Sequence, residues 1–396
     1  MKKVCFALAV MFCFCILAMP TYAGSVFAAE KKSVSVLAFG DSISAGYAPN
    51  STPYNVENSS NADDAKKHQM YVEYNNYLSS EYGKSASEFS YTKLMADLLT
   101  KNFGTEISNV ASYANSGDTS TDLVNLLTKD ESKQLASGNS VQTSVGTVQN
   151  AILSADVITL CIGANDVLTP ALKKISNIMT LSQTDVDELD AALDKNVETF
   201  KTNLEDIILP KLSQGGQVFV MTVYNPYKAF SKDSVKNMLS SLLGESNAEN
   251  IAENLNQLLQ VAISHLEQIN QIIRQNATND ILVVDIASKF NALTDEEYSI
   301  FVNANFDALS TNDLTSLVGG SYPTDLDPHP TPSGQESIAK SFAETYASKN
   351  NATEQIDENK LTTICLAVMA SVVALLAVTT TCVLIVKKIK YNKIHF

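Results

Sequence analysis

Residues 34–46 read VSVLAFGDSISAG, a short apolar run that ends in a Gly-Asp-Ser turn. The run over 34–39 is almost continuously apolar, which is typical of a strand buried on both faces of a parallel sheet. A serine on the tight turn between such a strand and the next helix presents an exposed hydroxyl, and its own N–H can face a substrate carbonyl. Gly, Asp and Ser are also ordinary turn residues, so the tripeptide alone favours a simple turn. Ser42 therefore becomes a candidate nucleophile only if partners for it exist elsewhere in the chain.

Similar apolar runs recur along the chain, with stretches of helical spacing between them. The expected strands lie at 34–39, 106–110, 157–162, 218–224 and 281–286. The expected helices carry apolar stripes within 91–99, 193–208 and 251–273, which we expect to face the core. Strands that alternate with helices predict an α/β fold, here a three-layer α/β/α sandwich around a five-stranded parallel sheet. In such folds ligands bind beyond the carboxyl ends of the strands.

The N-terminal residues have the layout of a secretory signal. Lys2 and Lys3 precede an apolar stretch over 4–17, and the small residue Ala23 follows it. We expect a signal peptide over 1–23, with cleavage as late as residue 28 as the alternative.

A longer apolar segment lies near the C-terminus. Residues 361–386 contain no charged side chain, and about 20 apolar residues are enough for a helix to cross a membrane. Four lysines follow within 387–396, which the positive-inside rule places in the cytoplasm. We therefore expect a single-pass transmembrane helix at 361–386, a basic cytoplasmic tail at 387–396 and a polar linker at 348–360. The main domain, at 30–347, would then be extracellular.

The charge of the chain excludes one class of partner. With 43 acidic and 28 basic residues, the net charge is −15 at pH 7, and several of the lysines fall in the expected signal and tail. Such a surface repels nucleic acid and anionic polymers. It favours neutral or hydrophobic substrates.

Cysteine usage indicates a domain without disulfides. Of six cysteines, Cys161 is the one outside the expected signal and membrane segments. No disulfide within the exported domain is therefore expected. Because Cys161 lies inside the apolar run 157–162, we interpret it as a buried core residue.

Three segments interrupt the alternation of strands and helices. Residues 49–87 are polar and predict a surface loop or partly helical insertion near the site, while 175–182 and 231–250 have the mixed character of a helical cap. The aromatic residues of these insertions are candidates either for an acyl pocket or for packing onto the core: Tyr71, Tyr74, Tyr77 and Phe230.

A serine nucleophile needs a base, and histidine is the usual one near neutral pH. Outside the two chain ends there are three histidines. His68 lies in the polar insertion and His265 on a long helical stripe, where packing or surface roles are the default. His329 instead lies in the proline-rich stretch 325–334, DLDPHPTPSG, and flanking prolines restrict the backbone in a way that suits a fixed side chain.

Two further strand ends carry groups that suit an oxyanion hole. Asn165 belongs to a Gly-Ala-Asn-Asp turn directly after the run 157–162, and its amide can point at an oxyanion or simply complete a turn. Gly117 follows the weaker second strand and offers an exposed backbone N–H. Asp41 and Asp166, next to Ser42 and Asn165, are interpreted as residues that stabilise the two turns.

These elements, in this order, resemble the four motif blocks of the SGNH (GDSL) hydrolase family. The resemblance covers about residues 34–346, leaves the insertions unmatched, and implies a flavodoxin-like SGNH hydrolase fold. It implies that Ser42 is the nucleophile and that His329 is the general base. It also implies an oxyanion hole built from the backbone N–H groups of Ser42 and Gly117 and the side chain of Asn165.

The acid that orients His329 departs from the family pattern. In most members an aspartate precedes the histidine by three positions, and here Leu326 occupies that position. Asp327, two residues before His329, is our first choice because it is nearest and shares the proline-stiffened turn. Asp325 is the alternative, and a backbone carbonyl is a third option.

The resemblance implies serine-dependent hydrolysis of carboxylic esters by an esterase or lipase at the cell surface, without a cofactor. The sequence holds no His/Cys cluster for a metal. We expect the partners to be a small-molecule, lipid or glycan ester as substrate and the membrane through the C-terminal helix. A deacetylase of cell-wall or dietary glycans and a non-catalytic surface binding domain are the alternatives.

Overall fold

The computed structural model describes residues 33–47, 62–129, 131–134, 140–304 and 327–350. The chain divides into the units Met1–Ala343 and Glu344–Phe396. In the second unit, residues 344–350 are described and are helical. The expected signal peptide (1–23), transmembrane helix (361–386) and tail (387–396) lie outside the described residues. Within the described part of the chain, no helix is both long enough and apolar enough to cross a bilayer.

A five-stranded parallel sheet forms the centre of the first unit. Its strands, in spatial order, are β2 (Ile107–Ser112), β1 (Val34–Gly40), β5 (Val157–Cys161), β6 (Gln217–Met221) and β7 (Ile281–Val284). This sheet confirms the predicted fold class. Counted along the chain, the strand order is 2-1-3-4-5, that of the flavodoxin-like folds, whose ligand crevice lies where the order reverses. Here the reversal lies between β1 and β5.

The burial of the strands explains why their sequences are continuously apolar. Every residue of β5 is buried, as are all but one of β1, whereas the edge strands β2 and β7 are only partly buried. Cys161 ends β5 as a free, fully buried thiol, as expected.

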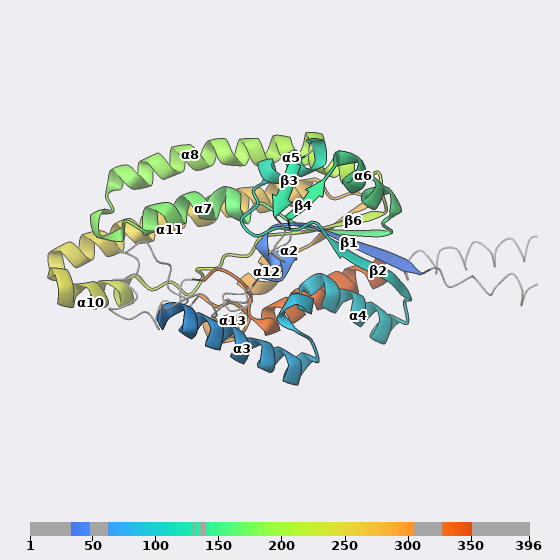
Figure 1. Ribbon diagram of the computed structural model, residues 1–396. Helices are drawn as coiled ribbons and strands as arrows, with labels where there is room; N and C mark the ends of the chain where they lie inside the picture. The colour runs from blue at the N-terminus through green and yellow to red at the C-terminus, as the bar shows by residue number, and fades with distance from the viewer. Residues whose placement is uncertain (1–32, 48–61, 130, 135–139, 305–326, 351–396) are drawn as a thin grey trace, which may run out of the picture. The chain divides into compact units, whose positions relative to one another are not determined.

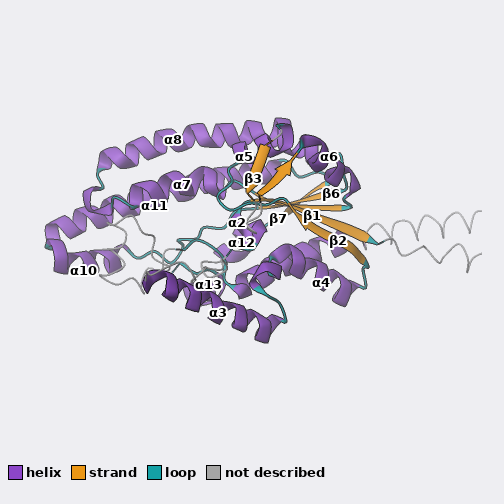
Figure 2. Cartoon of the chain, viewed as in Figure 1, coloured by secondary structure: helices purple, strands orange, loops and turns teal. Residues whose placement is uncertain are grey.

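Helices cover both faces of this sheet (Figures 1 and 2). On one side lie α5 (Ser120–Thr128), α6 (Val145–Ser154), α7 (Ala164–Ile175), α8 (Gln183–Thr202) and α11 (Glu245–Gln275). On the other side lie α4 (Tyr91–Phe103) and residues 332–343, the part of the last described helix that belongs to the first unit. The rings of Tyr91 and Phe342 stack with centroids 4.8 Å apart and so join these two helices. The three predicted apolar stripes lie on α4, on α8 with the π-helical turn η4 (Asn203–Ile208), and on α11, and they face the core.

The remaining elements are short or belong to the insertions. They are α2 (Ser42–Ala45), α3 (Ala62–Tyr82), η2 (Ala86–Glu88), η3 (Ile178–Thr180), α9 (Leu209–Leu212), α10 (Lys232–Leu243), α12 (Ile286–Asn291) and α13 (Asp295–Phe301). The expected insertion at 49–87 is thus largely helical where it is described. That at 231–250 forms α10 and the start of α11, and these two helices are tied together by ion pairs from Lys232 to Glu249 and Glu253. A small antiparallel hairpin of β3 (Glu131–Gln134) and β4 (Ser140–Thr143) was not predicted.

Candidate active site

The turn after β1 is built so that Ser42 sits at the start of α2. Gly40 has φ +130°, and a Cβ there would lie 1.9 Å from the carbonyl oxygen of Cys161, so only glycine fits. The backbone N–H of Asp41 donates to that same carbonyl at 3.0 Å, and its side chain accepts from the N–H of Ile43. The N–H of Ser42, at the first position of the helix, has no partner among the described residues. It is therefore available to a ligand.

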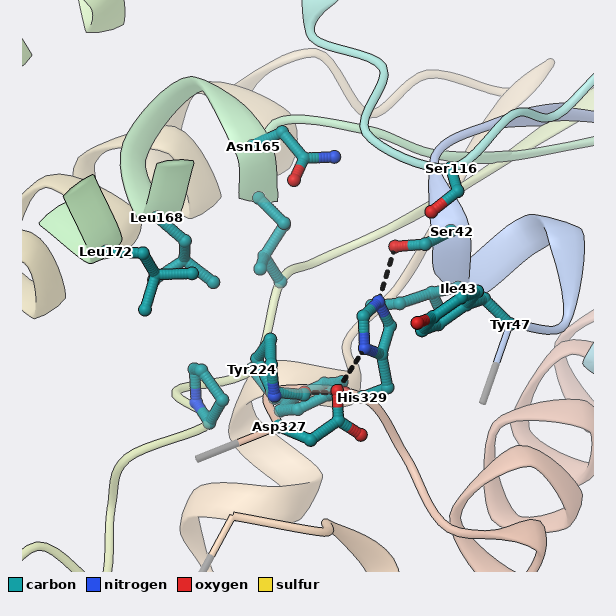
Figure 3. A pocket seen from close by; sticks show the side chains of 14 residues that line it. Ser42, Ile43, Tyr47, Ser116, Asn165, Leu168, Leu172, Tyr224, Asp327 and His329 are labelled. Carbon is teal, nitrogen blue, oxygen red and sulfur yellow. Dashed lines mark hydrogen bonds and ion pairs between the residues drawn. The ribbon is translucent and has the colours of Figure 1, made fainter. Parts of the chain in front are cut away.

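Ser42, His329 and Asp327 form a hydrogen-bonded chain (Figure 3). The Oγ of Ser42 lies 2.8 Å from Nε2 of His329, and Nδ1 of His329 lies 2.6 Å from Oδ1 of Asp327. Asp327, as an ionised carboxylate, can only accept, so Nδ1 carries the proton and the neutral ring leaves Nε2 to accept from the Ser42 hydroxyl. This tautomer is the one that a general base requires.

The loop that carries His329 is fixed by groups outside the predicted motifs. Asn303 donates from Nδ2 to Oδ2 of Asp327 at 3.0 Å, and its backbone N–H donates to the carbonyl of His329 at 3.1 Å. The hydroxyl of Tyr224 donates to the carbonyl of Pro328 at 2.8 Å. The ring of Tyr47 packs against the imidazole with centroids 4.5 Å apart.

Sequence reasoning missed all three of these contributors. Tyr224 is the last residue of the apolar run 218–224, at the carboxyl edge of the sheet. Because ligands bind at that edge, this position could have identified Tyr224 as a site residue from the sequence. Tyr47 lies five residues after Ser42, close to the nucleophile in the chain but without a motif of its own. Asn303 follows α13 in a segment without any motif.

The predicted oxyanion groups follow three different strands, and all three strands end at the same edge of the sheet. Asn165 lies in the first turn of α7, directly after β5, and in Figure 3 its amide nitrogen points to the side where Ser116 and Ser42 lie. One of its N–H groups donates to the carbonyl of Asp118 at 2.9 Å, which fixes the amide and leaves the second N–H available. Gly117, after β2, has φ +86°, and its N–H has no partner among the described residues.

The aspartates next to Ser42 and Asn165 hold the turns, as the sequence predicts. Asp166 accepts from the backbone N–H of Ser120 at 2.9 Å and from its hydroxyl at 2.6 Å, and thereby ties α5 to α7. Burial raises the pKa of Asp166. Burial also raises the pKa of Asp41 to about 7, against the opposing effects of the Ile43 N–H and of His329. Oδ2 of Asp41 is buried and has no partner within hydrogen-bond distance. The nearby Cys161 thiol nevertheless lowers the pKa of this carboxyl to a small extent.

Pro170 lies inside α7, where its missing N–H leaves the carbonyl of Asp166 without its usual helical donor. The side chain of Asn196, on α8, donates to that carbonyl at 2.8 Å instead. The proline is therefore accommodated, and α7 is tied to α8 at Asp166, the residue next to Asn165.

A pocket of about 270 Å³ opens over Ser42 and His329. Asn165 and Ser116 lie on its polar side, and its apolar wall includes Leu168, Leu172 and Pro226. The aromatic residues of the insertions do not line it: Tyr71, Tyr74, Tyr77 and Phe230. Of the two roles considered for them, the structure does not bear out that of lining this pocket, because the wall comes from α7 and from the loop after β6.

The remaining candidates lie elsewhere. Asp325, the alternative acid, falls outside the described residues, as does the side chain of His68. His265 is buried on α11, with Nε2 3.2 Å from Oδ1 of Asp194 on α8, a packing role of the kind expected. Within the described chain, no group of three or more His, Cys, Asp or Glu side chains is arranged to hold a metal ion.

Comparison with known proteins gives one family match. The family model described as GDSL-like Lipase/Acylhydrolase matches residues 36–342. No curated protein matches the chain. The chain is similar to the crystal structure of the lipase Lip_vut3 from a goat rumen metagenome, at 13% identity and TM-score 0.43, with 79% of this chain and 97% of that chain covered. It is also similar to Axe2, an acetylxylan esterase from Geobacillus stearothermophilus, at 16% identity and TM-score 0.29, over 80% of this chain and 95% of that one.

Proposed function

The chain belongs to the GDSL-like lipase/acylhydrolase family, and on that basis we propose that it hydrolyses carboxylic esters through an acyl-enzyme on Ser42. The observation that carries the proposal is the position of His329 between two partners. Its Nε2 lies 2.8 Å from Oγ of Ser42 and its Nδ1 lies 2.6 Å from Oδ1 of Asp327. A nucleophile, a base and an orienting acid in hydrogen-bond contact form the arrangement that activates a serine.

The proposed reaction is acyl transfer in two steps. Nε2 of His329 takes the Ser42 proton while Oγ attacks the ester carbonyl, and Asp327 stabilises the imidazolium that forms. The N–H groups of Ser42, Gly117 and Asn165 donate hydrogen bonds to the carbonyl oxygen and stabilise the negative charge that forms on it. His329 then protonates the leaving alcohol. In the second step His329 activates a water molecule that releases the acid and restores Ser42.

A serine-hydrolase probe tests the nucleophile directly. We expect a fluorophosphonate to label the full chain, and Ser42→Ala and His329→Ala to abolish labelling. Ser154→Ala is the matched control, because Ser154 is an exposed serine on α6 that does not line the pocket, and this variant should leave labelling unchanged. Labelling of Ser42→Ala would overturn the assignment of the nucleophile. A folded wild type that resists the probe would favour a non-catalytic binding domain on the same fold.

We also propose that the domain acts at the outer cell surface, held by the segment 361–386. The support is in the sequence: a signal-like start over 1–23, and an uncharged segment followed by four lysines. Protease treatment of intact cells should remove the domain and leave a short membrane-bound C-terminal fragment. Full protection in intact cells, with digestion only after lysis, would contradict this location.

A further inference from the structure

The helix that carries Asn165 continues as an apolar wall. Leu168 and Leu172 follow Asn165 at spacings of three and seven residues, which puts the three side chains on one face of α7. All three line the pocket, and in Figure 3 Leu168 and Leu172 lie on the opposite side of it from Ser42. One helix face therefore joins a candidate oxyanion donor to a hydrophobic surface.

The proposed reaction decides which part of an ester meets this wall. The leaving oxygen has to lie beside Nε2 of His329, which protonates it, and the carbonyl oxygen has to face Asn165. The acyl chain takes the remaining direction from the carbonyl carbon. The apolar lining that continues from Asn165 is formed by Leu168, Leu172 and Pro226.

We propose that this face of α7 binds the acyl chain, and that the enzyme prefers medium-chain acyl esters, of about six to eight carbons, to acetyl esters. The proposal rests on the proposed function and names its substrate class. The length follows from the helix: seven residues at 1.5 Å each place Leu172 about 10 Å beyond Asn165. A zigzag chain with bonds of ~1.5 Å covers that distance in roughly eight carbons.

Two features indicate that the bound acyl chain ends near Leu172. Leu168 is buried while Leu172 is half-buried, so the wall reaches solvent near Leu172. The next position on this face, Ser176, is polar and ends the helix. The pocket, at about 270 Å³, is close to the lower end of the ~300–1,000 Å³ of ligand sites, which suits one alkyl chain.

The test is the chain-length profile of kcat/KM for p-nitrophenyl esters from acetate to dodecanoate, measured on the full chain. Each CH₂ that reaches the wall should raise kcat/KM about threefold to fourfold, and the rise should stop near eight carbons. Leu172→Trp should move the optimum to shorter acyl chains. Leu172→Ala, which adds no bulk, should lower the ratio of kcat/KM for octanoate to kcat/KM for acetate severalfold.

Leu153→Trp is the matched control, because Leu153 is exposed on α6 and does not line the pocket. Its profile should equal that of the wild type. A wild-type profile that is highest for acetate, or variants at position 172 that slow all esters equally, would overturn the acyl wall while leaving ester hydrolysis in place. An absence of turnover for every ester, together with an absence of fluorophosphonate labelling, would overturn the proposed function itself.

Discussion

Nδ2 of Asn303 lies 3.0 Å from Oδ2 of Asp327, on the carboxylate oxygen that His329 does not use. The same amide nitrogen lies 3.1 Å from the carbonyl oxygen of His329. Asn303 thus binds both residues of the His329 loop that the proposed mechanism needs. It is a positioning residue, since it touches neither Ser42 nor the pocket.

Asn303→Ala should lower kcat by roughly 10- to 100-fold and leave KM for short esters nearly unchanged, because a hydrogen bond to a charged group contributes roughly 1.5–3 kcal/mol. Steady-state kinetics with an acetate ester measures both constants. Asn247→Ala, which removes an exposed asparagine on α11, is the control and should change neither. An equal loss in the control, or a change confined to KM, would argue against a positioning role.

Asp327→Asn should reduce kcat by roughly 10³–10⁴, because an amide in place of the carboxylate favours the wrong tautomer of His329. Asp325→Asn should stay close to the wild type. Rates of p-nitrophenyl ester hydrolysis for the two variants distinguish the two aspartates. The reverse ranking would make Asp325 the orienting acid.

Asn165→Ala should lower kcat by a factor on the order of 10²–10³, the usual effect of removing one oxyanion donor. Because Asn165 also donates to the carbonyl of Asp118, thermal unfolding has to accompany the kinetics. Lys173→Ala, at an exposed position of α7 that does not line the pocket, is the control and should keep its activity. Near-normal turnover of a folded Asn165→Ala would remove this side chain from the oxyanion hole.

Asp41 predicts a pH dependence of stability. Burial raises the pKa of its carboxyl to about 7 in the folded chain, from 3.8 when it is exposed, so between these values the folded state binds the extra proton. Stability should therefore fall as the pH rises from about 4 to 7, by at most ~4 kcal/mol. Asp41→Asn keeps an oxygen for the N–H of Ile43 but does not ionise.

Urea unfolding of the wild type and of Asp41→Asn, at pH 5 and at pH 8, measures this effect. The loss of unfolding free energy between the two pH values should be smaller in the variant. Equal losses in both proteins would show that other groups cause the pH dependence.

The sheet could be predicted from the sequence because its central strands are buried on both faces and therefore read as continuous apolar runs. Their ends could not be predicted as well. The run 218–224 continues past β6, which ends at Met221, since Val223 and Tyr224 are buried in the loop above the sheet. The N–H of Val223 donates to the side chain of Asn270 and not to a neighbouring strand. Burial thus extended the apolar pattern where strand pairing had stopped.

The site divides in the same way. Ser42 could be proposed because it lies in a tight Gly-Asp-Ser turn after a strand. His329 could be proposed because histidine is scarce in this chain and because the prolines on either side of it restrict the backbone. Asn303 could not, because its contact with Asp327 depends on how the segment after α13 meets the His329 loop. The hairpin of β3 and β4 was missed for a simpler reason: its strands have four residues each and carry few apolar side chains.

The hydrogen bond between Ser42 and His329 joins residues 287 positions apart in the chain. A ribosome that adds roughly 5–20 residues per second needs about 15–60 s to travel from one to the other. By then β7, the last strand of the described sheet, has already been made, because it ends at Val284. A nascent chain can thus hold every strand of its sheet, and the serine, and still lack the imidazole. On the proposed mechanism, a nascent chain is therefore inert until residue 329 has been added.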